Sequence, residues 1–340
     1  MKRAYTLFIL VFGLSLNLGV LAQESHQVEV KKDIVFASPE GFDLTMDIYT
    51  PQTGKPNYPV LIIIHGGGWL INNKSIMDEM SQYVSSHGEY VVANINYRLL
   101  GDQNNTVTIN EIVEDVFGAV LWVKEHIATY GGDPNKVAVT GDSAGGHLTE
   151  MVVLAGDNLK SHGFTMAPYG FKPSYLPAGK TAEQVAAEGG MKIQAAIPSY
   201  GAFDMLAAAQ GGFEKEANFF WQMGGAKARG LFGNDFTVEA NPEMYKAVSP
   251  AYLIPQASEK KLPPQFFHVG SKDNTTPPVA VKAYFDKLKE AGHPGEYWLY
   301  EGRNHAYLDS GSNEFLGNSF EKDAIEPLNR MIKFLDSVFY

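Results

Sequence analysis

The chain contains no cysteine in its 340 residues. This absence excludes disulfide bonds, thiolate metal sites and a lipid-modified cysteine anchor. If the protein is exported, its packed core alone has to stabilise it.

The chain also lacks an excess of positive charge. Lysine and arginine number 27 against 38 aspartate and glutamate residues, which gives a formal net charge of −11. Because a nucleic-acid partner requires a basic face, this balance argues against one. There is no internal repeat and no Ser/Pro-rich linker, so we expect residues 23–340 to form a single domain.

Long apolar runs are missing except at the start of the chain. Lys2 and Arg3 precede a mostly apolar stretch over residues 7–21, and small or moderate side chains stand just before Gln23. This layout predicts a signal peptide over residues 1–22, cut after Ala22, and a secreted or periplasmic protein without a stable membrane anchor. The alternative is an uncleaved anchor, since the stretch is near the lower limit for crossing a bilayer.

Short apolar runs alternate with helical patterns along most of the chain. An initial antiparallel pair is expected near residues 28–37 and 42–49, and buried strands near 60–64, 90–97, 137–139, 193–197, 265–269 and 297–300. Apolar residues at helical spacing predict helices near 109–130, 279–291 and 321–338. This alternation predicts an α/β fold with a mostly parallel sheet and helices on both faces.

Two stretches, near residues 157–190 and 206–248, interrupt the alternation and are rich in glycine, proline or aromatic residues. Long insertions in a compact domain are often lids or binding loops. They can equally be surface additions with small cores of their own, and the sequence favours neither reading.

Ser143 stands in the pattern Gly-x-Ser-x-Gly, between a predicted strand and a predicted helix. In that context the serine lies on a sharp turn that exposes its oxygen, as a nucleophile requires. The alternative is a serine that only caps the following helix.

A glycine run, His65-Gly66-Gly67-Gly68-Trp69, directly follows the predicted strand at 60–64. Consecutive glycines let backbone N–H groups approach a developing oxyanion. We expect the N–H groups of Gly67, Gly68 and Ala144 to form the oxyanion hole, with Gly66 as a near alternative.

A serine nucleophile needs a base, and the base needs an orienting acid. Asp273 and His305 each follow a predicted strand, so they are the expected acid and base. The other histidines considered are expected to be structural, namely His65, His147, His268 and His293. Asp142 is also expected to be structural, with its side chain pointing away from the pocket.

Together these motifs resemble the hormone-sensitive-lipase-like branch of the α/β hydrolases, whose order is serine, acid, histidine. HGGGW, GDSAGGHL, GSKDNTTP and the late Asn304-His305 pair carry the resemblance, which is strongest to bacterial feruloyl and acetyl (xylan) esterases. It implies the α/β-hydrolase fold and a serine carboxylesterase without a metal or other cofactor.

The resemblance further implies a small-molecule or polysaccharide-linked ester as substrate, with acetyl or feruloyl as the acyl group. Trp69 and the aromatic residues of the second insertion are candidates to stack on that substrate. They can equally form the core of a lid, which is the expectation for most of them. The alternatives are an amidase or arylformamidase of the same fold, and a catalytically silent carbohydrate-binding protein. The sequence does not predict the oligomeric state.

Overall fold

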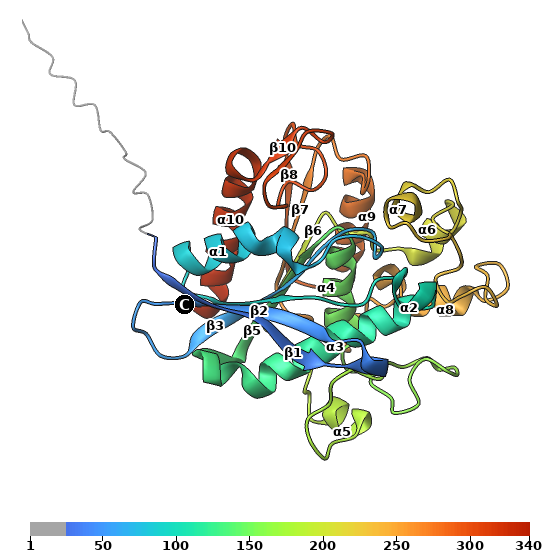
Figure 1. The fold of residues 1–340 in the computed structure, drawn as a ribbon, viewed down its shortest axis with the longest axis horizontal. Helices are drawn as coiled ribbons and strands as arrows, with labels where there is room; N and C mark the ends of the chain where they lie inside the picture. Colours follow the sequence, from blue (N-terminus) through green and yellow to red (C-terminus); the bar gives the residue numbers. More distant parts are fainter. Residues whose placement is uncertain (1–24) are drawn as a thin grey trace, which may run out of the picture.

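A computed structural model describes residues 25–340, and its centre is one eight-stranded sheet (Figure 1). The strand order is β1-β2-β4-β3-β5-β6-β7-β8. Strand β2 runs antiparallel to both of its neighbours, and the pairs from β4 to β8 are all parallel. The strands are β1 (Val28–Ala37), β2 (Leu44–Pro51), β3 (Tyr58–Ile64), β4 (Val91–Ile95), β5 (Gly132–Asp142), β6 (Ala195–Ser199), β7 (Gln265–Gly270) and β8 (Gly295–Tyr300).

Helices cover both faces of this sheet (Figure 1). On one face lie α3 (Ile109–His126), α4 (Ala144–Ala155) and α9 (Pro278–Glu290). On the other lie α1 (Asp78–His87) and α10 (Ile325–Phe339), which a hydrogen bond between Tyr83 and Asn329 joins. The α/β-hydrolase architecture expected from the sequence is therefore confirmed.

Shorter elements complete the chain. They are the helices α2 (Asp102–Asn105), α5 (Ala182–Ala187), α6 (Met205–Gln210), α7 (Phe219–Met223) and α8 (Pro242–Ala247), the small strands β9 (Ser312–Asn313) and β10 (Asn318–Ser319), and single turns η1 (Pro39–Gly41), η2 (Lys74–Met77), η3 (Ile127–Tyr130), η4 (Pro250–Tyr252) and η5 (Phe320–Ala324).

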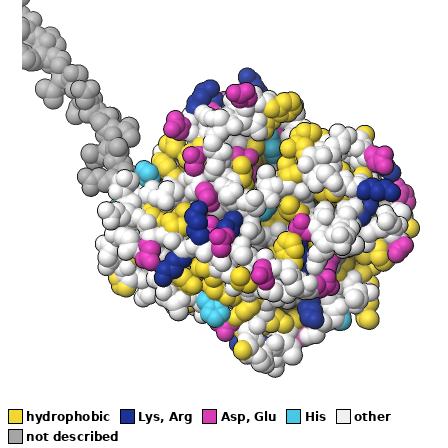
Figure 2. All heavy atoms as spheres, in the orientation of Figure 1, with side chains coloured by type: hydrophobic (Ala, Val, Ile, Leu, Met, Phe, Trp, Pro, Cys, Tyr) yellow, Lys and Arg dark blue, Asp and Glu magenta, His cyan; other side chains and the backbone are white. Residues whose placement is uncertain are grey.

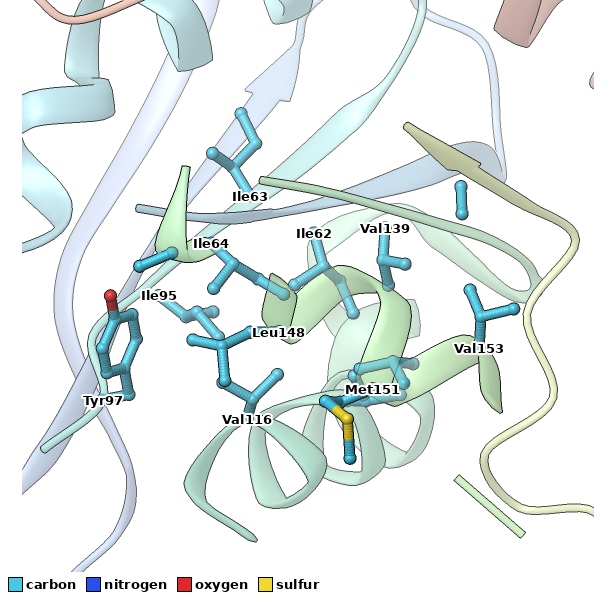
Figure 3. Close-up of a cluster of buried hydrophobic side chains, with 14 of the residues drawn as sticks. Ile62, Ile63, Ile64, Ile95, Tyr97, Val116, Val139, Leu148, Met151 and Val153 are labelled. Atoms are coloured by element: carbon cyan, nitrogen blue, oxygen red, sulfur yellow. The ribbon is translucent and has the colours of Figure 1, made fainter. Parts of the chain in front are cut away.

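The buried run of β3 shows why the centre of the sheet is apolar on both faces. Ile62 and Ile64 point towards Leu148 and Met151 of α4, whereas Ile63 points to the opposite side of the sheet (Figure 3). Successive side chains of a strand alternate between faces, so a strand covered by helices on both sides must be apolar at every position.

Most strands differ from their predicted ranges by one or two residues at an end, and β5 differs most. The sequence predicts a helix up to about residue 130 and a strand only over residues 137–139, yet β5 already begins at Gly132. Its register with β3 shifts between the pairs Tyr58↔Gly132 and Val60↔Val137. This irregularity places Asp133 and Pro134 in extended backbone without the apolar pattern that predicts a strand.

The first insertion packs beside α3, on the side where α5 lies in Figure 1. The ring of Phe171 contacts Phe117 of α3, and the backbone N–H of Ser174 donates to the carbonyl of Glu114. The second insertion, with α6, α7 and α8, meets the first where the ring of Phe232 stacks on that of Phe164 at 5.4 Å. Its other contacts are described with the site below.

The predicted signal peptide lies outside the described residues. Within residues 25–340, no helix is long and apolar enough to span a membrane. Acidic, basic and apolar side chains are interspersed on the face shown in Figure 2, without an extended basic stripe.

Candidate active site

Ser143 occupies the turn between β5 and α4. Its backbone angles are φ 53° and ψ −114°, a conformation that costs energy for any residue with a side chain. The turn also depends on its glycines, because a Cβ at Gly145 would overlap the carbonyl of Ile64. The side chain of Ser143 makes no capping hydrogen bond to α4, so the capping alternative is wrong.

Three side chains from three loops form a continuous hydrogen-bonded chain. Ser143 Oγ lies 2.8 Å from His305 Nε2, and His305 Nδ1 lies 2.7 Å from Asp273 Oδ2. All three residues are buried, with Ser143 6% and His305 7% exposed. Since Nδ1 faces a carboxylate, it carries the proton, and Nε2 is left to accept the hydrogen of the serine hydroxyl.

The carboxylate of Asp273 is itself held by the loop that follows β7. Its Oδ1 accepts the backbone N–H groups of Thr275 and Thr276, each at 2.9 Å. These donors fix the carboxyl group towards His305. The spacing Asp-x-Thr-Thr is typical of such a turn, in which an aspartate accepts amides a few residues ahead.

The other histidines considered each have a different place. His147 lies on α4 between the indole N–H of Trp69, which donates to Nδ1 at 3.2 Å, and the carbonyl of Val248, 2.8 Å from Nε2. Burial lowers the pKa of His147 to about 4. His147 is therefore neutral, with its hydrogen on Nε2. It joins the glycine loop, residues 65–69, to the end of the second insertion.

His65 is the first residue of the glycine run, and its ring stacks on that of Tyr97 with the centroids 4.2 Å apart. Its Nδ1 is 2.7 Å from the carbonyl of Gly66, and burial lowers its pKa to about 4. His268, inside β7, lies between Ser199 and Tyr307. His293 contacts the backbone of Leu262 and Pro255.

The glycine loop has the backbone conformation that the run of glycines suggests. Gly67 and Gly68 adopt φ +117° and +58°. Within residues 25–340, neither of their N–H groups has a protein acceptor. A Cβ at Gly68 would lie 2.6 Å from the ring of Phe220 in α7, so the second insertion lies directly against this loop.

Asp142 lies beneath the same loop. Its carboxyl group is so close to Gly66 that a Cβ there would overlap it. Burial raises the pKa of Asp142 to about 6, while interaction with His305 acts in the opposite direction. Its contacts with Gly66 stabilise the backbone of the glycine loop.

At Trp69 the structure favours the core role over substrate stacking. Its side chain is only 3% exposed, and its ring meets the edges of His147 and Phe213 at 5.2 and 5.4 Å. The ring thus fills the space between α4 and the second insertion and offers no free face. These contacts support a packing role for Trp69 in place of substrate stacking. One of its packing partners, Phe213, comes from the second insertion.

Sequence reasoning missed Tyr200 and Thr276, which lie against the Asp273–His305 pair. The ring of Tyr200 is 5.0 Å from that of His305, and its carbonyl accepts the hydroxyl of Thr276 at 2.7 Å. Tyr200 directly follows β6, so the rule that selected Asp273 and His305, a polar residue at a strand end, would also have selected it.

The parallel sheet, the serine turn and the convergent loops define the chain as an α/β hydrolase. Comparison with known families is more specific: residues 46–288, more than two thirds of the chain, match the BD-FAE family, and the chain belongs to that family.

The sequence identity to individual relatives is low. Esterase LipQ of Mycobacterium tuberculosis is 29% identical over 262 residues, which is 75% of this chain and 52% of LipQ. Carboxylesterase NlhH of the same species is 34% identical over 116 residues, 34% of this chain and 35% of NlhH. The chain thus spans about half the length of LipQ.

Among solved structures, the apo form of Thermogutta terrifontis esterase 2 has a TM-score of 0.64 at 21% identity, covering 93% of this chain and 96% of the other. At that identity the similarity concerns the fold.

Proposed function

We propose that this protein is a serine carboxylesterase in which Ser143 is the nucleophile. The observation that carries the proposal is the hydrogen-bonded chain from Ser143 Oγ through His305 to Asp273. Esterase names among the relatives that match three quarters of the chain support the same reaction.

In the first step, His305 Nε2 takes the hydroxyl proton of Ser143 as Oγ attacks the ester carbonyl. Asp273 holds the imidazole tautomer and stabilises the imidazolium. The bond between the carbonyl carbon and the leaving oxygen then breaks. The leaving group takes the proton from His305 Nε2 and departs as the alcohol, and a covalent acyl-serine remains. Water, activated by His305, then hydrolyses the acyl-enzyme and regenerates Ser143.

The N–H groups of Gly67, Gly68 and Ala144 are the proposed donors to the oxyanion. Each such donor contributes about 3–4 kcal/mol to the stabilisation of the transition state in enzymes of this type. The strained backbone of Ser143 and the positive φ of both glycines are the features that support this assignment.

The direct test uses Ser143→Ala and p-nitrophenyl acetate. The variant is expected to lose activity by a factor of at least about 10⁴, while its melting temperature and circular dichroism stay close to those of the unmodified protein. Full hydrolysis by a folded variant would contradict the proposal. A fluorophosphonate probe should label Ser143 in the unmodified protein only.

The finer proposal concerns the substrate: a short acyl ester, acetyl or feruloyl, carried by a small molecule or by plant polysaccharide. Membership of the BD-FAE family supports it. A panel of acetylated xylan, methyl ferulate, p-nitrophenyl acetate and a matched anilide separates acetyl, feruloyl and amide preferences. A higher rate on the anilide than on the ester would favour an amidase instead.

Export through cleavage after Ala22 is part of the same proposal, supported by the basic start and the apolar stretch at 7–21. Cell fractionation with N-terminal sequencing tests it. A mature protein that begins at Gln23 outside the cytoplasm is the expected outcome.

A further inference from the structure

Thr276 is a buried polar side chain that the acyl-transfer steps above do not use. Its Oγ1 lies 2.7 Å from the carbonyl of Tyr200, 3.1 Å from Asp273 Oδ2 and 3.2 Å from His305 Nδ1. The hydroxyl therefore has three polar neighbours at hydrogen-bonding distance, two of which belong to the proposed acid and base.

Counting hydrogens decides what this hydroxyl can do. A threonine hydroxyl has one hydrogen to donate and lone pairs to accept with. The carbonyl of Tyr200 can only accept, and it is the nearest of the three neighbours. Once the hydrogen points to Tyr200, Oγ1 can only accept from the remaining neighbours, and the sole hydrogen there is the one on His305 Nδ1.

The Tyr200 carbonyl is well fixed, so the direction of that hydrogen is fixed too. Tyr200 is fully buried at the end of β6, with an unusual φ of 34°. Its N–H donates to the carbonyl of His268 at 2.7 Å, and its phenol oxygen accepts the N–H of Leu308 at 3.3 Å. Tyr200 thus connects β6 and β7 to the loop that carries His305.

We infer that Thr276 is a positioning residue for His305, accepting a second, weaker hydrogen bond from Nδ1–H beside the main bond to Asp273. This inference rests on the proposed role of His305 as the base. Because both acceptors favour the protonated imidazole, Thr276 makes His305 more basic and restricts the rotation of its ring.

Other ionisable groups lie around the same ring, and the test changes none of them. The pKa of Asp142, raised by burial to about 6, falls within the measured pH range in every variant, so the shift between variants is the quantity compared. The charge of His305 acts on Asp142 at the end of β5, and the charge of Asp142 acts on Asp309, on the His305 loop. The phenols of Tyr200 and Tyr307 are buried, which raises their pKa values well above the usual range and keeps them neutral.

The test compares Thr276→Val, which removes the hydroxyl but keeps the shape, with Thr276→Ser, which restores it. The measurement is kcat/KM for p-nitrophenyl acetate from pH 4.5 to 9. In the valine variant the acidic limb of the profile should move to lower pH by about 0.5–1 unit, the size expected for one weak hydrogen bond to a charged group. The serine variant should return the limb to its original position, with KM nearly unchanged in both.

The sign of the shift separates the alternatives. A shift to higher pH would mean that Thr276 donates to Asp273 and would overturn the inference, and an unmoved limb would overturn it as well. Loss of stability alone would lower the melting temperature without moving the limb, and if the valine variant does not fold, Thr276→Ala is measured in the same way. Retained hydrolysis by Ser143→Ala would instead refute the proposed function.

Discussion

Both insertions contain glycines and several aromatic residues, but they lie differently with respect to the serine turn. The first packs its aromatic rings on the outer side of α3, where Phe171 contacts Phe117. The second places Phe220 over Gly68 and Phe213 against Trp69, next to the serine turn. The buried rings of both insertions join the hydrophobic core that includes the sheet, and Phe164 of the first stacks on Phe232 of the second. Aromatic content therefore marks segments that pack on the core, and the fold decides which of them borders the site.

The largest expected difference between the two regions comes from glycines with positive φ. Gly68→Ala would force a Cβ to within 2.6 Å of Phe220 and displace a proposed oxyanion donor, so kcat/KM should fall by about 100-fold. Gly179→Ala is the matched control in the first insertion, with φ +77° and open space around it. It should cost about 1–2 kcal/mol of stability and leave ester hydrolysis unchanged. Equal activity in the two variants would remove the distinction between the regions.

Buried aromatic rings give the next comparison. Phe171 is fully buried in the first insertion, so Phe171→Ala should lower the free energy of unfolding by about 3–5 kcal/mol without changing kcat/KM well below the melting temperature. Phe213→Ala should also destabilise, but it frees Trp69 beside the glycine loop and should lower kcat/KM several-fold as well. Urea denaturation combined with kinetics measures both effects. A change in kcat/KM for Phe171→Ala of the same size would show that the first insertion also influences the site.

The smallest expected differences concern how stability depends on pH. A buried group beside each insertion should change that dependence, and the two changes should have opposite signs. Burial raises the pKa of Glu114, which accepts the N–H of Lys172 in the first insertion, to about 8. The native state then binds a proton that the unfolded state releases, so this contribution to stability is complete below about pH 4.5 and is lost as pH rises through 8. The stability of Glu114→Gln relative to the unmodified protein should therefore increase as the pH rises from 5 to 9.

For His147, beside the second insertion, burial lowers the pKa from 6.5 to about 4. Its contribution is complete above about pH 6.5 and is lost as pH falls through 4, because the unfolded state then binds the extra proton. His147→Gln should be less stable at pH 7, and the gap should narrow towards pH 4.5. Urea denaturation at pH 4.5, 7 and 9 tests both variants; parallel pH profiles for them would contradict the assignment of opposite signs.

Local patterns were enough to predict most of the sheet and the loops that meet at Ser143. The apolar runs at residues 60–64 and 265–269 predict strands because they reflect burial on both faces of the sheet. The candidates Asp273 and His305 followed from one rule: carboxyl ends of parallel strands meet at one edge, so polar residues just beyond them lie close together. The early start of β5 at Gly132 escaped prediction because Asp133 and Pro134 are polar or lack the ladder N–H.

What the sequence by itself determined is the fold class and the positions of Ser143, Asp273 and His305 along the chain, because periodicity and strand ends are local properties. Only the tertiary structure decided the packing of Trp69, the different placement of the two insertions and the contact of Thr276 with Tyr200 and His305. Those contacts join residues far apart in the chain, and whether a ring is buried or a hydroxyl accepts depends on which partners the folded chain brings within a few ångströms.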